Sequence, residues 1–197
     1  MLRTLLREGT RVQHARAEAA LPLLDPMLTR ERYVRCLAAL HALQAPLERR
    51  LAACADWSEL GIAAAERWRA ARIVDDLRAL GASPLPAVAS GADLPDLATR
   101  GRALGARYVL EGATLGGRVV ARHLATTLAL TPTRGASFFA GHGERTGAMW
   151  REFERALDHA ALGWCEPADV LAGARDTFDA FTRWLGAASR APLASVA

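Results

Sequence analysis

The feature that most limits the fold of this chain is the near absence of any pattern typical of a β-strand. Alternating apolar and polar runs rich in valine, isoleucine and threonine do not occur, and the helix-favouring residues alanine, leucine, arginine and glutamate dominate. We therefore expect an all-α bundle of six or seven helices, forming a single domain over 1–197, with a frayed tail after about residue 187. The helices are predicted over about 2–20, 30–54 (after an N-cap at Thr29), 58–80, 96–130, 144–162 and 167–186.

Composition and charge narrow the class of protein further. The chain is 51% apolar and 23% charged, as in an ordinary globular protein. No apolar run approaches the ~18 residues that cross a bilayer, and charge interrupts the N-terminus too early for a signal-peptide core, so we predict no membrane span and a cytoplasmic location. All 25 basic residues are arginine, they stand among 21 acidic residues, and the net charge is only +4. No basic run marks a DNA-binding face, so we expect no nucleic-acid partner.

Lysine and cysteine usage exclude further chemistry. A chain without lysine can form neither a Schiff base with a carbonyl substrate nor the lysine contact of a phosphate-binding loop. The three cysteines, Cys36, Cys54 and Cys165, are widely spaced and form no CxxC motif. We expect them to be reduced and buried as small apolar side chains.

One face of the first predicted helix carries an unusual row of polar residues. Two guanidiniums that can bind carboxylates and one imidazole that can bind a metal suit an anionic, metal-bearing ligand. A carboxylate one turn beyond the histidine can accept the other N–H of the imidazole and fix the orientation of the ring. The alternative is an exposed stripe of helix-internal Arg–Glu pairs. The row, spaced at i, i+4, i+7 and i+11, consists of Arg7, Arg11, His14 and Glu18, with Thr10 beside it.

The longest predicted helix contains five glycines, each of which costs about 1 kcal/mol relative to alanine. A helix that gives up this much stability needs its backbone close to something. Close packing against a neighbouring helix is one explanation, and a flat ligand lying on bare backbone, with a bend allowed by an adjacent glycine pair, is the other. The glycines are Gly101, Gly105, Gly112, Gly116 and Gly117.

The two helices together resemble the haem oxygenase family. Residues 7–18 resemble its proximal helix, where a Thr-x-x-x-His-x-x-x-Glu pattern provides the axial histidine, and residues 108–117 resemble its glycine-rich distal helix. The likeness extends to 150–153 and to the aromatic pair Phe178 and Phe181, so it covers nearly the whole chain. The proximal pattern alone is weak, but both motifs in order and at this separation are specific. The implied fold is a helical bundle that holds haem between the two helices.

The resemblance implies which residues bind haem, which is both substrate and prosthetic group in this family. His14 would be the axial ligand of the haem iron, in a Thr10-x-x-x-His14-x-x-x-Glu18 pattern in which Glu18 steers the imidazole. Basic residues that would lie against the propionates are Arg7, Arg11 and Arg151. Glycines that would leave space for dioxygen are Gly112, Gly116 and Gly117.

The resemblance also implies the reaction and its partners. Dioxygen and electrons from a reductase or ferredoxin-type donor would convert haem to biliverdin, carbon monoxide and ferrous iron. The glycine-rich stretch resembles the bacterial branch that supplies biliverdin to bacteriophytochromes, which suggests such a protein as the acceptor of the product.

One departure from the family pattern puts turnover in question. Well-known members have an aspartate directly after the first distal glycine, where it orders the water that supplies protons, and this chain has Ala113 there. A non-degrading haem carrier or sensor on the same fold is therefore the alternative function. We nevertheless predict turnover, with water ordered instead by a backbone carbonyl at the glycine pair, by Glu111 or by Arg118.

Other functions have less support in the sequence. A di-iron oxidase needs Glu-x-x-His pairs, and no acidic residue has a histidine three positions on. A thiamine-degrading hydrolase needs a cysteine nucleophile and a base, and no cysteine has a histidine within four positions. A helical regulatory or DNA-binding protein would need a basic recognition stripe. The remaining histidines, His41, His123, His142 and His159, are expected to be surface or hydrogen-bonded residues.

Overall fold

The computed structural model describes residues 2–84, 90 and 93–190, with side chains up to residue 186. The expected all-α fold is confirmed: the described residues form seven α-helices and three short 3₁₀ turns, and no β-strand. Of the tail predicted to fray after about residue 187, the part up to Arg190 continues helix α7, and the part beyond it lies outside the described residues. The α-helices are α1 (Leu2–Gly9), α2 (Arg11–Ala20), α3 (Arg30–Cys54), α4 (Ala70–Ala79), α5 (Arg100–Leu128), α6 (Thr146–Ala160) and α7 (Pro167–Arg190), and the 3₁₀ turns are η1 (Trp57–Leu60), η2 (Ala64–Arg67) and η3 (Gly143–Arg145).

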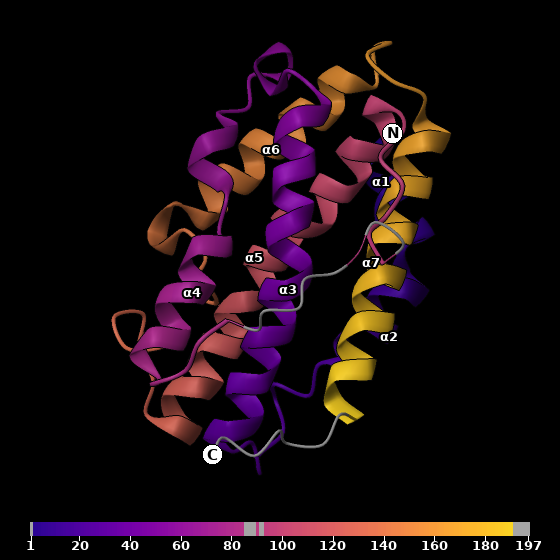
Figure 1. Cartoon of the computed structure of the whole chain (residues 1–197). Coiled ribbons are helices and arrows are strands. Elements are labelled where there is room, and N and C mark those ends of the chain that lie inside the picture. The colour runs from indigo at the N-terminus through magenta and orange to yellow at the C-terminus, as the bar shows by residue number, and fades with distance from the viewer. Residues whose placement is uncertain (1, 85–89, 91–92, 191–197) are drawn as a thin grey trace.

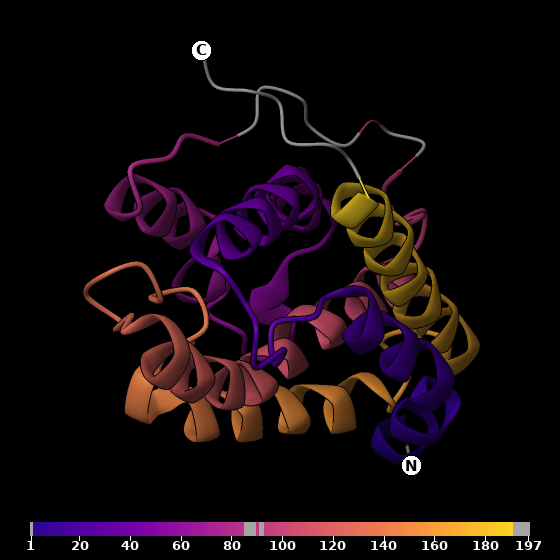
Figure 2. The same cartoon turned by 90° about the horizontal axis from the view of Figure 1, so that it is seen from below.

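Helix α7 lies along one edge of the bundle and carries much of its packing (Figures 1 and 2). It packs against α5, α2, α3 and α1, while α4 lies against α3 and α6 lies against α5 and α1. Seen from below, α1 and α2 lie on one side of α7, with α3 and α5 on other sides. The apolar core draws on residues from Leu2 to Leu185, so the first and last helices share one hydrophobic cluster.

Threonine caps set the starts of the two longest helices. The hydroxyl of Thr29 accepts a hydrogen bond from the backbone N–H of Arg32, as the sequence predicted, and Thr99 does the same for Arg102. Each cap satisfies one of the backbone N–H groups that have no partner inside the helix. The long helix therefore begins a few residues later than predicted, at Arg100, and continues unbroken through its glycines to Leu128.

Two predicted helices differ from the structure. The first is divided at Thr10, whose backbone (φ −111°, ψ 2°) leaves the helical region although its hydroxyl still bonds to the Leu6 carbonyl. The second, predicted over 58–80, is two 3₁₀ turns followed by α4, because the chain turns at Gly61 (φ 67°). That left-handed turn lets Trp57 and Ile62 both enter the core, and tertiary burial here overrides helix propensity.

The closest helix contact uses two glycines to bring backbones together. A Cβ on Gly105 would lie 2.0 Å from the carbonyl oxygen of Val170, and a Cβ on Gly173 would lie 2.1 Å from that of Arg102. Gly101 is similarly close to Asp169. The first two glycines of α5 therefore serve helix packing, which fixes α5 and α7 in a single register.

Candidate functional site

His14 is an exposed imidazole held in a defined orientation. Its side chain is 57% exposed, and its ring lies edge-on against Phe178 of α7, with 5.4 Å between ring centroids. The Oε2 atom of Glu18 lies 3.5 Å from Nδ1 of His14, one turn along α2. A carboxylate at Nδ1 leaves Nε2 of His14 available for a metal.

Helix α2 is unusual because none of its ten residues is buried, although it packs against α7. Val12 is among the exposed large apolar residues of the chain. A helix with one face on the protein and an apolar side chain in solvent on another has surface left for a ligand.

The junction of α1 and α2 touches α5 through Tyr108. Burial raises the pKa of Tyr108, while its hydrogen bond with Thr10 and the charge of Arg7 act to lower it. Thr10 is itself buried, so this contact holds the end of α1 against α5. Arg7 is exposed beside the phenol, and a guanidinium next to a phenolic hydroxyl is suited to a carboxylate.

The contacts of α7 show how the helices of the predicted site run relative to one another. Gly9 at the end of α1 lies against Leu171 and His14 of α2 lies against Phe178, so the chain from Gly9 to His14 runs along α7 in the same direction. Gly101 lies against Cys165 and Asp169, and Gly105 lies against Val170 and Ala174, so α5 also follows α7 in that direction. Tyr108 of α5 hydrogen-bonds with Thr10 at the start of α2, so the two helices meet at this point. His14 and Gly112 therefore each lie four residues, about one helical turn, beyond the contact between α5 and the start of α2.

From Gly112 onward, α5 has an open apolar face. Leu115 and Val119 are 39% and 47% exposed, a Cβ on Gly116 would meet nothing within 4 Å, and a Cβ on Gly112 would meet only the Trp150 ring, at 3.9 Å. Positions 112, 115, 116 and 119 share one side of a helix. The fit to a flat ligand is direct, because the face offers apolar side chains around bare backbone.

The five glycines of α5 thus divide into two groups. Gly101 and Gly105 pack against α7, and Gly117 is buried with its Cα facing the Phe139 backbone, where a Cβ would lie 2.7 Å from the carbonyl oxygen. Gly117 is therefore not part of the open face. Of the five, Gly112 and Gly116 lie on the open face.

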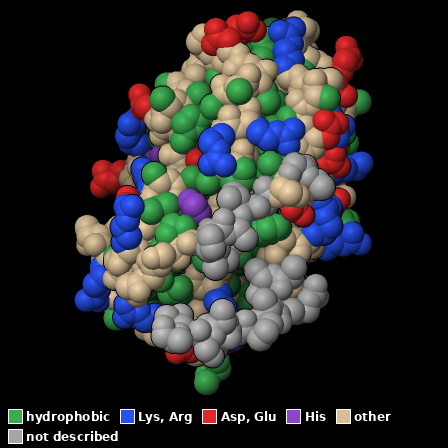
Figure 3. Space-filling model, viewed as in Figure 1, with side chains coloured by type: hydrophobic (Ala, Val, Ile, Leu, Met, Phe, Trp, Pro, Cys, Tyr) green, Lys and Arg blue, Asp and Glu red, His purple; other side chains and the backbone are tan. Residues whose placement is uncertain are grey.

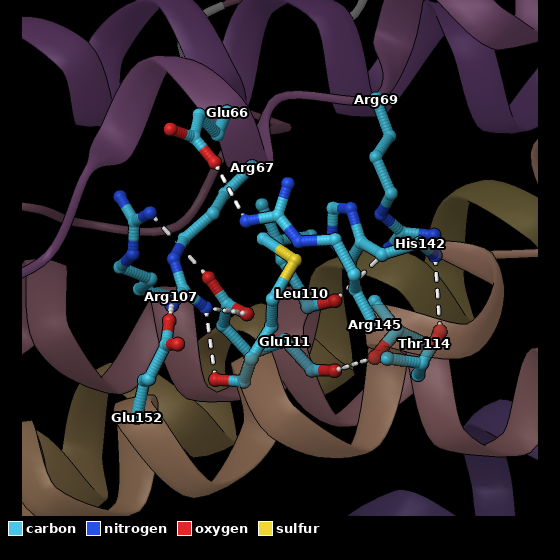
Figure 4. A network of polar contacts seen from close by, with 12 residues as sticks. Glu66, Arg67, Arg69, Arg107, Leu110, Glu111, Thr114, His142, Arg145 and Glu152 are labelled. Atoms are coloured by element: carbon cyan, nitrogen blue, oxygen red, sulfur yellow. Dashed lines mark hydrogen bonds and ion pairs between the residues drawn. The ribbon is translucent and has the colours of Figure 1, made fainter.

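The opposite side of α5 holds a buried ionic cluster (Figure 4). Arg67, at the end of η2, bonds to Oε2 of Glu111 at 2.9 Å, to the Met149 carbonyl at 3.1 Å and to Glu152 at 2.7 Å. Nη2 of Arg107 lies 3.4 Å from Oε1 of Glu111. Glu111 therefore stands between two buried guanidiniums, which offset the cost of removing its charge from water.

Arg107 is a buried cation enclosed by aromatic rings. Its side chain is 1% exposed, and its Cζ lies 4.7 Å from the ring centres of both Trp57 and Trp68. Burial lowers the pKa of Arg107 to about 10, and Glu111 opposes that effect, so the group stays charged at neutral pH. The two indole rings make cation–π contacts with the faces of the guanidinium.

The segment from Arg67 to Ala70 ties this cluster to the rest of the bundle. The backbone N–H groups of Arg69 and Ala70 donate to the buried carboxylate of Glu48 on α3, at 2.9 and 3.0 Å. The Arg69 guanidinium donates to the carbonyl of Leu110 on α5 at 3.0 Å and to that of Phe138 at 3.3 Å. The segment 67–70 thus contacts α3, α5, α6 and the loop before η3.

His142 differs from the expectation of a hydrogen-bonded or surface histidine. Its Nε2 is buried and has no hydrogen-bond partner in the part of the chain that the structure describes. Burial, followed by the charges of Arg69, Arg72, Arg67 and Arg145, lowers the pKa of His142 to about 4. The imidazole is therefore neutral at physiological pH.

The structure brings together some of the predicted residues and not others. Arg7 and Thr10 lie near Tyr108 of α5, and His14 pairs with Glu18 on α2 while its ring lies against α7. Arg11 is exposed on α2, and Arg151 is exposed on α6 with its guanidinium 3.5 Å from the Cβ position of Gly147 on the same helix. Among the groups considered as substitutes for the missing aspartate, Arg118 is exposed and Glu111 is buried behind the glycine face.

Sequence reasoning missed the buried arginines. Arg107 and Glu111 are four residues apart, the spacing of an ordinary exposed helix pair, and Arg67 and Arg69 lie in a stretch predicted to be a continuous helix. The only signal was the unusual density of tryptophan around them, since Trp57 and Trp68 supply the stacking faces.

The alternative enzyme classes are not supported by the site. In the described ranges, no three histidine, cysteine, aspartate or glutamate side chains gather as a metal-binding group, as a di-iron site would need. Burial raises the pKa values of Cys36, Cys54 and Cys165, which disfavours a thiolate nucleophile. None of the described helices is long and apolar enough to span a bilayer. On the surface in Figure 3, arginines are spread among acidic and apolar side chains.

The fold and the site define a helical protein that can hold a flat, metal-bearing, anionic ligand between two helices, with a histidine on one side and bare backbone on the other. Comparison with known proteins makes the class specific. The family model for Heme oxygenase matches residues 1–187. A haem oxygenase from Xanthomonas campestris pv. campestris (strain 8004) is 31% identical over 160 residues, which cover 80% of this chain and 91% of that protein.

Two solved structures share the fold. The NO- and CO-bound haem oxygenase from Neisseria meningitidis has a TM-score of 0.83 at 22% identity, covering 99% of this chain and 95% of that chain. The haem oxygenase from Leptospira interrogans has a TM-score of 0.72 at 22% identity, covering 94% and 98%. The chain belongs to the haem oxygenase family. Family and fold support a haem-degrading oxygenase, and no finding favours the non-degrading alternative.

Proposed function

We propose that this chain binds haem through His14 and cleaves it with dioxygen to biliverdin, carbon monoxide and ferrous iron. The observation that carries the proposal is that the exposed imidazole of His14 and the start of the open face of α5 each lie about one helical turn beyond the Thr10–Tyr108 contact. One supplies a neutral nitrogen ligand, and the other supplies an apolar surface that a porphyrin plane can cover.

Each residue around His14 has a distinct part in holding the substrate. Nε2 of His14 binds the iron, and Glu18 at Nδ1 together with the edge of Phe178 holds the imidazole plane. Arg7 and Arg11, with the Tyr108 hydroxyl, bind the propionates. Exposed ion pairs of this kind contribute little individually, so they orient the haem more than they hold it.

The face of α5 controls access to the other side of the substrate. Gly112 and Gly116 leave the volume that a Cβ would occupy free for a small diatomic molecule, while Leu115 and Val119 exclude bulk water once the haem covers them. Bound haem supplies the iron that activates dioxygen, and the electrons come from a reductase or ferredoxin-type donor. In this proposal Gly117 and Thr10 act indirectly, by packing. Arg151 acts at the solvent-exposed edge of the site.

The test combines binding with turnover. Wild-type protein should bind haem one to one with a histidine-ligated Soret band, and the band should be lost in His14→Ala and recovered with added imidazole. His159→Ala, at an exposed histidine of α6, is the matched control and should leave the spectrum unchanged. With ascorbate or a reductase under air, the Soret band should give way to biliverdin absorption with release of carbon monoxide.

Two results would contradict the proposal. An unchanged Soret band in His14→Ala would remove the axial ligand assignment. Haem that stays intact through repeated reduction under air would instead support the carrier or sensor that Ala113 suggests. We further propose a cytoplasmic location and a bacteriophytochrome as acceptor of the biliverdin. Transfer of product to an added apo-phytochrome, seen as its red absorption band, would test that acceptor.

A further inference from the structure

The orientation of the open face of α5 depends on contacts made by its opposite side. Beyond Gly112, the residues of the open face have few contacts with protein that could resist rotation of the helix. On the opposite side, Glu111, Thr114 and Gly117 are buried at intervals of three residues. Of these, only Glu111 is held by charge, since Thr114 bonds to a carbonyl of its own helix and Gly117 makes backbone contact with Phe139.

The geometry points to Glu111 as a positioning residue for haem cleavage. Its bond to Arg67 of η2 fixes the rotation of α5 and so the direction in which Gly112 and Gly116 face, while Arg107, on α5 itself, pairs with the same carboxylate. It precedes Gly112 directly and does not itself face the open side. The inference rests on the proposed function, because it assigns Glu111 a part in the same site.

The contacts of Arg67 explain how this control reaches the substrate side. The same guanidinium that binds Glu111 also binds the Met149 carbonyl and Glu152 on α6. Trp150, next to Met149, is the side chain that approaches Gly112. Arg67 therefore holds α5 and α6 in a fixed relative position. This position determines the distance between the backbone of Gly112 and the Trp150 ring. Figure 4 shows Arg67 lying between Glu111 and Glu152.

The ion pair between Glu111 and Arg67 resists separation because both groups are buried. The Glu111 side chain is 6% exposed and Arg67 is 2% exposed, whereas Glu152 is 46% exposed. A buried, hydrogen-bonded pair is sensitive to the removal of one partner, because the remaining charge is left uncompensated. Rotation of α5 would carry Arg107 along with Glu111, but it would move Glu111 away from Arg67 of η2 and Arg107 away from Trp57 and Trp68, so the rotation is opposed.

The experiment replaces the charge and keeps the shape, with Glu111→Gln. The matched control is Asp76→Asn, at a buried carboxylate on α4 that accepts the backbone N–H groups of Ser137 and Phe138 and has no bond to α5. Both changes should lower the melting temperature. Only Glu111→Gln should raise hydrogen exchange of amides 112–119 relative to those of α3 in the haem-free protein, by about tenfold or more.

Turnover supplies the second readout. In Glu111→Gln, haem affinity should stay within about threefold of wild type, since no haem contact is removed, while the ratio of minor to major biliverdin isomers rises about tenfold or more. Asp76→Asn should leave the isomer ratio unchanged. If Glu111→Gln folds poorly, Glu111→Gln with Arg107→Met removes both charges and restores stability while the exchange and isomer effects persist.

Failure of this inference is distinguishable from failure of the proposed function. A wild-type protein that binds haem without degrading it would contradict the function, and exchange of amides 112–119 in Glu111→Gln would still support or contradict the positioning role. If Glu111→Gln loses stability but keeps wild-type exchange across 112–119 and a single isomer, Glu111 only stabilises the fold and the inference is wrong.

Discussion

The division of the glycines of α5 into packing and ligand-facing positions predicts opposite effects of the same substitution. A methyl group at Gly105 would lie 2.0 Å from the Val170 carbonyl oxygen and 2.6 Å from the Ala174 nitrogen. Both neighbours are backbone atoms of a packed helix, so neither can rotate away. Carbon atoms settle near 3.5–4.0 Å from their neighbours, so the two helices would have to separate by more than 1 Å.

The magnitudes follow from the two opposing terms. Overpacking costs about 1–3 kcal/mol and more where backbone must move, while alanine gains about 1 kcal/mol over glycine in a helix. Gly105→Ala should therefore destabilise the protein by about 2 kcal/mol or more, which lowers the melting temperature by about 4–8 °C in a protein of this size. Gly116→Ala meets nothing within 4 Å and should raise the melting temperature by about 2–4 °C.

Thermal and urea unfolding followed by circular dichroism measure this difference in the haem-free protein. Haem titration separates stability from function, because a leucine at Gly116 or Gly112 should keep the helical content and sharply weaken haem binding. Equal stability of Gly105→Ala and wild type would refute the assignment of Gly105 to helix packing. Full haem affinity in both leucine variants would refute the assignment of Gly112 and Gly116 to the ligand face.

Two further predictions concern charge. Arg7→Ala and Arg11→Ala should each weaken haem binding by roughly 3- to 100-fold and give mixed biliverdin isomers; a double variant with normal binding and one isomer would make these arginines ordinary surface charge. The folded-state pKa of His142 is lowered from 6.5 to about 4, so the unfolded chain binds the extra proton first, and the stability supplied by the neutral imidazole is lost as the pH falls from about 6.5 to about 4. His142→Gln should flatten this part of the pH–stability curve measured by urea unfolding; an unchanged curve would mean that His142 does not titrate there.

Local patterns made much of the fold predictable. Thr29 begins α3 as an N-cap because its hydroxyl accepts from the next turn, which is an interaction within four residues of chain. The Thr10-x-x-x-His14-x-x-x-Glu18 spacing places the carboxylate beside Nδ1 of His14, since residues four apart meet on a helix surface. Such features depend on neighbours in sequence, so the sequence contains what is needed to infer them.

Long-range contacts decided the features that sequence reasoning missed. Residues 58–80 consist of good helix formers, but burial of Trp57 and Ile62 on either side of Gly61 replaced the first part of the predicted helix by 3₁₀ turns. Arg107 and Glu111 look like a surface pair, yet the pair is buried because Arg67 arrives from another element. A residue's neighbours across the bundle are not encoded in its local spacing.

The sequence by itself determined the all-helical class, the order of the helices and the two motifs that identify the family, because helix propensity, capping and i, i+4 spacing act within a few residues. Only the tertiary structure decided which glycines lie on an open face. Gly105 and Gly116 have the same intrinsic preferences on the same helix, and they differ only in that the backbone of α7 lies against one and open space lies beside the other. It also decided what holds that face in place, since the buried pairing of Glu111 with Arg67 joins residues 44 positions apart, and its strength comes from the removal of both charges from water.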